Sequence, residues 1–381
     1  MPGVPVHVAV TTPSLLIDLF CQVVDNYGDI GVCWRLARSL TEKTPHRVRL
    51  WVDNLAAFQR LEPRIDHSGY QALSNQITLW HWERIHQVEQ AGDVVIEAFG
   101  CDLPAPFLPK MLEQNSLWIN LEYLSAEDWV NDCHGMPSLQ SNGLRKYFFF
   151  PGFASATGGL LREPDLLERR DNWRATPNLR WSQLKELGVP AELCDMLLHG
   201  GRQVFLFNYP NAPTTALVRA LNTDSKPAVI LQPHENGTHA SQLASYVHLV
   251  KIPFVPQVHF DTLLWGSDLN FVRGEDSLVR AIWAGAPFIW HIYPQESNAH
   301  LLKLSAWLNK SPFDERVKQL QIAWNHADAA NWEDIISALV SRPEHWQAWC
   351  HSCQQWASDL ARQADLATNL LQFFTLHAGT R

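Results

Sequence analysis

Two aspartates, Asp25 and Asp29, lie where an apolar run gives way to a helical pattern, in the segment VVDNYGDIGVCWRLARSL (23–40). A buried strand followed by a short glycine turn and a helix leaves both carboxylates near the carboxyl end of the strand, where open α/β sheets have their clefts. There Asp25 can act as a general base, with Asp29 holding the local geometry or the acceptor. The alternative is structural: Asp25 or Asn26 caps the helix, Asp29 complements its dipole, and Gly28 permits the tight turn.

A second pattern, FVRGEDSLVRAIWAGAPFIWHIYPQ (271–295), also predicts a strand that ends where a helix begins. The residues at this junction are Arg273, Gly274, Glu275, Asp276 and Ser277. The N–H groups of a helix amino terminus, a serine hydroxyl and an arginine fork suit a diphosphate, the leaving group of a nucleotide-activated sugar. Two carboxylates would repel phosphate unless they point elsewhere, for example at ribose hydroxyls. The alternative is a capped helix with an acidic first turn.

Aromatic and amide side chains between these patterns are candidates for recognising a nucleobase. They are Tyr209, Phe254, Gln257 and Phe260. A nucleobase needs a π-face to stack on and a partner for its polar edge, and stacking contributes about 1–3 kcal/mol per base in single-strand binders. The alternative is ordinary core, in a chain that holds 17 Phe, 17 Trp and 7 Tyr.

Other familiar motifs are absent from the sequence. No P-loop, H-E-x-x-H or G-x-S-x-G pattern occurs, which disfavours P-loop chemistry, metal catalysis and serine hydrolysis. Cys350 and Cys353 have a redox-like or zinc-like spacing but no second pair at a suitable distance, so a core helix is favoured. The turn at 28–31 lacks the G-x-G-x-x-G order of a dinucleotide fingerprint.

Apolar, β-rich runs alternate with helix-period runs along most of the chain, which predicts βαβ units and parallel sheets. The predicted strands lie within 15–24, 46–54, 77–82, 94–99, 117–123, 145–150, 203–210, 227–233, 247–255, 269–274 and 287–294. In the first predicted helix, the apolar residues recur with helical spacing and form one buried face, while Arg35 and Arg38 face elsewhere.

The stretch 151–180 breaks this alternation with glycine, proline and charge, so we place the join between two doubly wound α/β domains there. The predicted domains are 1–175 and 176–345. Residues 346–381 are predicted to form a long terminal helix that packs back on the body. Its apolar face contains Trp346, Trp349, Cys353, Trp356, Leu360 and Leu371.

The composition fits this layout and limits the class of protein. The chain has 381 residues, 46% hydrophobic residues and a formal charge of −9, which excludes disorder as the main state and argues against adhesion to nucleic acid or anionic membranes. An acidic surface suits a cationic acceptor. No apolar run spans a bilayer and no signal peptide is recognisable, so we expect a cytoplasmic protein, and its seven scattered cysteines are expected to be reduced.

The combination of DNYGDIGVCWRLARSL with VRGEDSLVRAIWAGAPFIWHIYPQ resembles the bacterial protein-arginine rhamnosyltransferases that modify translation elongation factor P. The resemblance implies a GT-B glycosyltransferase with two Rossmann-like domains facing a central cleft. The acceptor would bind on the amino-terminal domain and dTDP-β-L-rhamnose mainly on the carboxyl-terminal domain. Rhamnose would pass with inversion to a guanidino nitrogen of an arginine of elongation factor P, without a metal or cofactor, activating it for rescue of polyproline-stalled ribosomes.

The resemblance also implies roles for individual residues. Asp25 matches the family's proposed general base and Asp29 its second important acid, while Glu275 would either polarise the guanidinium or fix the donor. The residues expected to bind substrate are Asn26, Tyr27, Gly28, Tyr209, Phe254, Gln257, Phe260, Arg273, Gly274, Asp276 and Ser277. Two alternatives stay open: a GT-B enzyme with another nucleotide sugar or acceptor, and a noncatalytic nucleotide-sugar-binding protein.

Overall fold

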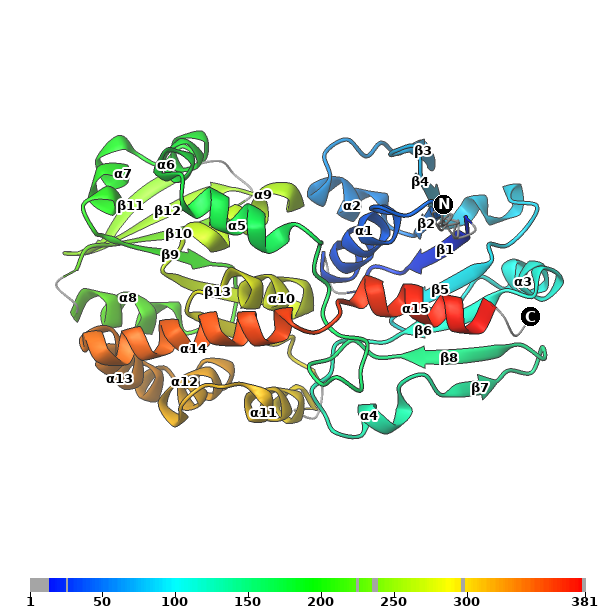
Figure 1. Cartoon of the computed structure of the whole chain (residues 1–381). Coiled ribbons are helices and arrows are strands. Elements are labelled where there is room, and N and C mark those ends of the chain that lie inside the picture. Colours follow the sequence, from blue (N-terminus) through cyan, green and yellow to red (C-terminus); the bar gives the residue numbers. More distant parts are fainter. Residues whose placement is uncertain (1–13, 25–26, 224–225, 235–238, 296–298, 379–381) are drawn as a thin grey trace, which may run out of the picture.

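The computed structural model of the chain contains two α/β domains side by side, each built on its own sheet (Figure 1). It describes residues 14–24, 27–223, 226–234, 239–295 and 299–378. Both sheets are mostly parallel, as expected when helices connect successive strands. The predicted pair of doubly wound domains is therefore confirmed.

The first sheet has eight strands within the described residues, in the order β3-β4-β2-β1-β5-β6-β8-β7. The strands are β1 (Leu16–Cys21), β2 (Arg47–Val52), β3 (Tyr70–Ala72), β4 (Ile77–His81), β5 (Val94–Ala98), β6 (Leu117–Leu121), β7 (Pro137–Leu139) and β8 (Arg145–Phe149). The connecting helices are α1 (Gly28–Thr41), α2 (Leu55–Leu61), η1 (Trp82–Gln87), η2 (Ala105–Phe107), α3 (Leu108–Gln114) and α4 (Val130–Cys133). The short strands β3 and β7 run antiparallel at the two edges.

The second sheet has six strands within the described residues, in the order β11-β12-β10-β9-β13-β14. They are β9 (Arg202–Leu206), β10 (Ala228–His234), β11 (His239–Ala244), β12 (Val247–Pro253), β13 (Leu269–Arg273) and β14 (Phe288–His291). The helices of this domain are α5 (Leu166–Arg174), α6 (Pro177–Glu186), α7 (Ala191–Leu198), α8 (Thr214–Thr223), α9 (Gln257–Gly266), α10 (Gly274–Ala284), α11 (Ala299–Lys310), α12 (Glu315–Asn325) and α13 (Ala329–Val340). Helix α5 precedes the boundary placed at 175, yet it packs on α6 and α9.

The prediction of a single terminal helix for 346–381 is wrong, because the chain forms two helices there, α14 (Pro343–Ala361) and α15 (Leu366–Ala378). Arg162 donates hydrogen bonds to the carbonyls of Ala361 and Gln363, and the Asp365 carboxylate accepts one from the Thr368 N–H. These bonds satisfy backbone groups that a continuous helix would pair internally. Helix α14 packs on α10 and α13 of the second domain, whereas α15 packs on α1 and β6 of the first (Figure 1).

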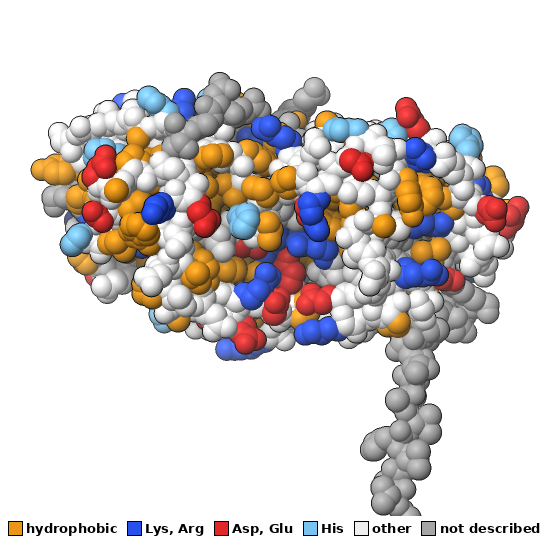
Figure 2. All heavy atoms as spheres, turned by 90° about the horizontal axis from the view of Figure 1, so that it is seen from above, with side chains coloured by type: hydrophobic (Ala, Val, Ile, Leu, Met, Phe, Trp, Pro, Cys, Tyr) orange, Lys and Arg blue, Asp and Glu red, His pale blue; other side chains and the backbone are white. Residues whose placement is uncertain are grey.

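Each domain has its own core. One cluster of buried side chains fills the second domain, and two others cover the two faces of the first sheet. Viewed from above, acidic and basic side chains are interspersed over the middle of the molecule (Figure 2). Within the described residues, no helix is both long and apolar enough to cross a membrane.

Candidate active site

Two strand-to-helix turns, β1 to α1 and β13 to α10, bring the two sequence patterns to the junction between the domains. Helices α1 and α10 pack against each other there. Asp25 and Asn26 lie outside the described residues. Helix α1 begins at Gly28, and its N-cap residue Tyr27 makes no side-chain capping bond. The Tyr27 side chain therefore does not cap the N–H groups at the start of α1.

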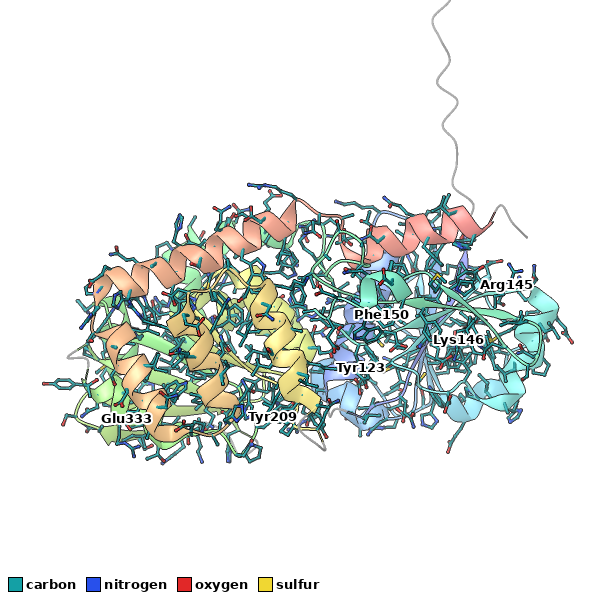
Figure 3. All side chains as sticks on the ribbon, turned by 90° about the horizontal axis from the view of Figure 1, so that it is seen from below. Tyr123, Arg145, Lys146, Phe150, Tyr209 and Glu333 are labelled. Atoms are coloured by element: carbon teal, nitrogen blue, oxygen red, sulfur yellow. The ribbon has the colours of Figure 1, made fainter. Side chains whose placement is uncertain are left out.

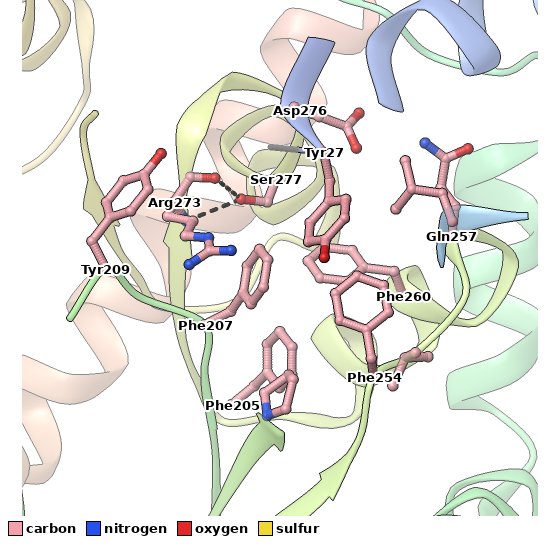
Figure 4. A pocket seen from close by; sticks show the side chains of 14 residues that line it. Tyr27, Phe205, Phe207, Tyr209, Phe254, Gln257, Phe260, Arg273, Asp276 and Ser277 are labelled. Carbon is pink, nitrogen blue, oxygen red and sulfur yellow. Dashed lines mark hydrogen bonds between the residues drawn. The ribbon is translucent and has the colours of Figure 1, made fainter. Parts of the chain in front are cut away.

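An aromatic pocket of about 650 Å³ lies between the two turns (Figure 4). It is lined by Tyr27, Gly28, Leu61, Phe205, Phe207, Tyr209, Pro233, Phe254, Val255, Gln257, Phe260, Arg273, Asp276 and Ser277. The Tyr27 and Phe254 rings are 5.0 Å apart across the junction, and Phe260 packs edge-on against Phe207 at 5.6 Å. The pocket thus offers several π-faces to a planar ligand.

Arg273 lies at the wall of the aromatic pocket beside the start of α10. Its guanidinium carbon is 4.4 Å from the Phe207 ring centre and 5.0 Å from that of Tyr209, and its Nη1 donates to the Asn208 carbonyl at 3.2 Å. Gly274 has φ +65°, which lets the chain turn from β13 directly into α10. The Arg273 guanidinium and the positive end of α10 therefore border the same space, which is suited to bind an anion.

Two of the predicted ligand-binding side chains make protein contacts of their own. The Ser277 hydroxyl accepts a hydrogen bond from the Arg273 N–H at 3.0 Å and donates one to the Arg273 carbonyl. Gln257 donates from Nε2 to the Gly31 carbonyl at 2.8 Å and accepts from Arg38 at 3.4 Å. Both residues border the pocket, and both also hold its walls in place.

His291 supports the pocket from behind. Its Nδ1 accepts the backbone N–H of Tyr209 at 3.2 Å, and its ring packs edge-on against that tyrosine. Burial, together with the nearby positive charge of Arg273, lowers the pKa of His291 to about 4. The imidazole is therefore neutral at pH 7, which keeps Nδ1 available as an acceptor.

A second pocket, the carboxylate pocket, opens on the other side of the α1 terminus and has a volume of about 840 Å³. Its lining residues are Val24, Gly28, Asp29, Val32, Phe99, Tyr123, Leu124, Gly274, Glu275, Trp290, Ile292, Tyr293, Gln295 and Lys303. Asp29 accepts the Val24 N–H at 2.8 Å, and Glu275 accepts the Leu124 N–H at 2.8 Å across the junction. Two carboxylates from different domains therefore border one space.

The two pockets meet at Gly28, which lines both of them. Figure 3 shows Tyr209, which belongs to the aromatic pocket, and Tyr123, which belongs to the carboxylate pocket, on the two sides of the domain junction. The structure thus groups the described predicted residues around one point. Asp29 and Glu275 lie on one side, and Arg273 with the aromatic residues lies on the other.

Several pocket residues were not anticipated from the sequence. Phe205 and Phe207 belong to the same segment as Tyr209, and strand alternation from Tyr209 would have pointed to them. Phe99 and Tyr123 stack with ring centres 4.5 Å apart, and the Lys303 ammonium lies 5.7 Å from the Tyr123 ring. These last three come from segments with no motif, so only the tertiary fold brings them together.

The fold and the site together define a glycosyltransferase of the GT-B class. A solved structure of the spinosyn rhamnosyltransferase SpnG shares this fold with a TM-score of 0.51 and 12% identity, over 94% of this chain and 99% of that one. The chain matches the family described as Elongation-Factor P (EF-P) rhamnosyltransferase EarP over residues 17–375, and it belongs to this family of protein-arginine rhamnosyltransferases.

Two relatives illustrate the match. The protein-arginine rhamnosyltransferase of Pseudomonas aeruginosa is 41% identical over 94% of this chain and 98% of its own length. A solved EarP structure, which concerns arginine glycosylation of translation elongation factor EF-P, has 29% identity and a TM-score of 0.64, over 95% of this chain and 99% of that one. The predicted family and the GT-B fold are therefore confirmed.

Proposed function

We propose that this rhamnosyltransferase takes rhamnose from dTDP-β-L-rhamnose and transfers it, with inversion, to an arginine of elongation factor P in the cytoplasm. The observation that carries the proposal is the meeting of two unlike pockets at Gly28. One is aromatic and borders an arginine and a helix amino terminus, and the other is bordered by carboxylates. A donor nucleotide and a cationic acceptor require these two environments.

The aromatic pocket suits the nucleotide part of the donor. Thymine would stack among rings such as Phe254 and Phe260, and a stacked base gains about 1–3 kcal/mol in comparable nucleic-acid sites. The diphosphate would lie against Arg273 and the amino terminus of α10, which stabilise the negative charge that grows as dTDP leaves. Asp276, at the edge of this pocket, is suited to accept hydrogen bonds from ribose hydroxyls.

The carboxylate pocket suits an arginine side chain. A guanidinium has a pKa above about 12 and delocalised lone pairs, so it needs carboxylates that orient it and accept a proton as the new bond forms. Glu275 and Asp29 border this space, and Asp25 precedes the same helix in the sequence. We assign Asp25 as the base and Glu275 as the group that orients the guanidinium.

The proposed transfer is a single displacement. The guanidino nitrogen forms a bond to the anomeric carbon, the bond from that carbon to the dTDP oxygen breaks, and the nitrogen's proton passes to the base. One displacement inverts the anomeric centre and needs no nucleophile from the enzyme. Arg273 and α10 supply the positive charge on the leaving side, the role that a divalent ion has in other glycosyltransferases.

The test is intact-mass spectrometry of elongation factor P after incubation with the protein and dTDP-rhamnose, with and without a chelator. We expect a mass gain of one deoxyhexose that survives chelation and maps to an arginine. UDP-rhamnose and UDP-glucose serve as control donors. A gain with a control donor but not with dTDP-rhamnose would contradict the donor assignment, and no gain despite nucleotide binding would contradict the acceptor.

A further inference from the structure

A cluster of charged side chains, four of them buried and two partly buried, joins the two domains beside the aromatic pocket. Its members are Arg35 and Arg38 of α1, Glu163, Asp261 of α9, and Asp276 and Arg280 of α10. Three guanidinium groups face three carboxylates, so the cluster is formally neutral. Burial of ions is tolerated when they are paired and hydrogen-bonded in this way.

Arg35 is the member that connects the cluster to the donor pocket. It is 1% exposed, and its Nη1 lies 3.3 Å from Glu163 and 3.4 Å from Asp261. On the other side of the guanidinium, Nε lies 3.1 Å from Asp276 Oδ1. Asp276 lines the aromatic pocket, so the contact from α1 of the first domain reaches a wall of the pocket in the second.

Arg280 provides a natural comparison, because it is equally buried and pairs with the same two partners, Glu163 and Asp261. Its distances are 2.7 Å to Glu163 Oε2 and 2.6 Å to Asp261 Oδ2. Burial by itself would raise the pKa of Glu163, but Arg280 and Arg35 outweigh it and hold that pKa well below its usual range. Both arginines therefore stabilise the junction, whereas the close contact with Asp276 comes from Arg35.

The backbone of α1 approaches the same wall closely. A Cβ atom at Gly31 would lie 3.2 Å from Asp276 Oδ2 and 3.4 Å from Gln257 Nε2. Gln257 also donates to the Gly31 carbonyl. The helix that presents Asp29 to the carboxylate pocket is thus fixed to two residues of the aromatic pocket.

We propose that Arg35 is a positioning residue for the transfer reaction. It holds the Asp276 carboxylate in the donor pocket and couples that pocket to α1, so that the donor and the acceptor-side carboxylates keep one fixed separation. This deepens the proposed function and rests on it, because the aromatic pocket must be the donor site. Bound nucleotide is in turn expected to tighten α1 against α10, since coupling between two elements is reciprocal.

The test compares Arg35→Lys with Arg280→Lys. The probe is whichever of dTDP, UDP and GDP the wild-type protein binds most tightly by calorimetry. If the donor assignment is wrong, the wild-type protein will prefer UDP or GDP. If the coupling through Arg35 is wrong, the wild type will bind as expected and only the comparison of the variants will show it. We expect both variants to lower Tm. Arg35→Lys should weaken nucleotide binding about tenfold, because Asp276 loses the guanidinium that holds it at the pocket wall, while Arg280→Lys stays within about threefold.

A double-mutant cycle identifies the route of the effect. In an Asp276→Asn background, Arg35→Lys should cause little further loss of nucleotide affinity, because the contact with the Asp276 carboxylate is already gone. It should still lower Tm, because Arg35 pairs with Glu163 and Asp261 in this background and the substitution weakens those pairs. Equal losses of affinity in Arg35→Lys and Arg280→Lys, or additive losses in the cycle, would overturn the proposal and leave Arg35 with a purely structural role.

Hydrogen exchange of the wild-type protein keeps the proposal testable if Arg35→Lys does not fold. The nucleotide is expected to slow amide exchange in residues 32–41, the part of α1 that follows the pocket-lining turn. Unchanged exchange in this segment at saturating nucleotide would contradict the coupling between the donor pocket and α1.

Discussion

The Arg273 side chain is stacked on aromatic rings and also lies beside a helix amino terminus. Its planar guanidinium lies over the rings of Phe207 and Tyr209, and the start of α10 is adjacent. Stacking fixes the plane of the fork, and a fixed fork loses less entropy when it binds phosphate oxygens. A lysine at this position would keep the charge but not the orientation.

Replacing Arg273 should therefore weaken nucleotide binding. For Arg273→Ala we expect dTDP affinity to fall about 10- to 100-fold, corresponding to roughly 1.5–3 kcal/mol for hydrogen bonds to a charged group. Calorimetric titration measures the change. Arg64→Ala, at a side chain that is 69% exposed, is the matched control and should bind dTDP normally. Unchanged affinity in Arg273→Ala would remove the diphosphate assignment.

Asp25 and Glu275 are distinguished by substitutions that keep shape and remove charge. Asp25→Asn should abolish turnover with dTDP affinity nearly intact, because an amide cannot accept the proton. Glu275→Gln should lower kcat about 100-fold or more, because the neutral amide no longer attracts the guanidinium. The fold should not change, because the amide keeps an oxygen that accepts the Leu124 N–H. Glu83→Gln, at a side chain that is 88% exposed, serves as the control. Near wild-type turnover in Asp25→Asn would show that Asp25 is not the essential base.

The burial of Arg35 could not be predicted from the sequence. Helical periodicity in 28–43 correctly separated the apolar face of α1 from Arg35 and Arg38. It did not show that Arg35 is buried, because its partners Glu163 and Asp261 lie more than a hundred residues away in the sequence. Periodicity reports how a helix packs on its own sheet, but not what a second domain places against its other face.

At the level of elements, the sequence predicted the long parallel strands well because they are continuous apolar runs. The edge strands β3, β7 and β11 were missed. Strand β11 reads HASQLA and exposes most of its side chains, so it has no apolar alternation to detect. The break between α14 and α15 was missed for a different reason. It depends on Arg162, which comes from a distant part of the chain.

The hydrogen bond from the Tyr209 N–H, which lies after β9, to His291 at the end of β14 predicts a pH dependence of stability. His291, with a pKa of about 4 in the folded chain, has an ordinary pKa of about 6.5 when unfolded, so the unfolded chain takes up the proton first as the pH falls. The stability that neutral His291 contributes is complete above about pH 6.5 and is lost progressively towards about pH 4.

Urea unfolding of the wild type and of His291→Asn at pH 7 and pH 5 measures this contribution. The amide oxygen of asparagine occupies the position of Nδ1 and can still accept the Tyr209 N–H, but asparagine does not titrate in this range. We expect the wild type to lose more stability between the two pH values than the variant. Equal losses would show that another group is responsible for the acid sensitivity.

At the level of the whole molecule, the chain returns to the first domain after completing the second (Figure 1). Helix α15 lies on α1 and β6, and its side chains Leu366, Leu370 and Phe374 are at most 1% exposed within the core of that domain. The first domain is therefore complete only when the last helix docks. The two domains are then linked by two crossings of the chain as well as by the α1–α10 contact.

This arrangement predicts that a substitution near the carboxyl terminus destabilises the amino-terminal domain. Leu370→Ala should lower the free energy of unfolding by about 2–5 kcal/mol, because it opens a cavity in a packed core. Leu376 of the same helix is 74% exposed, so Leu376→Ala is the matched control and should change stability by less than about 0.5 kcal/mol. Urea unfolding, with hydrogen exchange to locate the effect, should show the loss in β1, β5 and β6. Equal stability of the two variants, or a loss confined to the second domain, would contradict the assignment of α15 to the first domain's core.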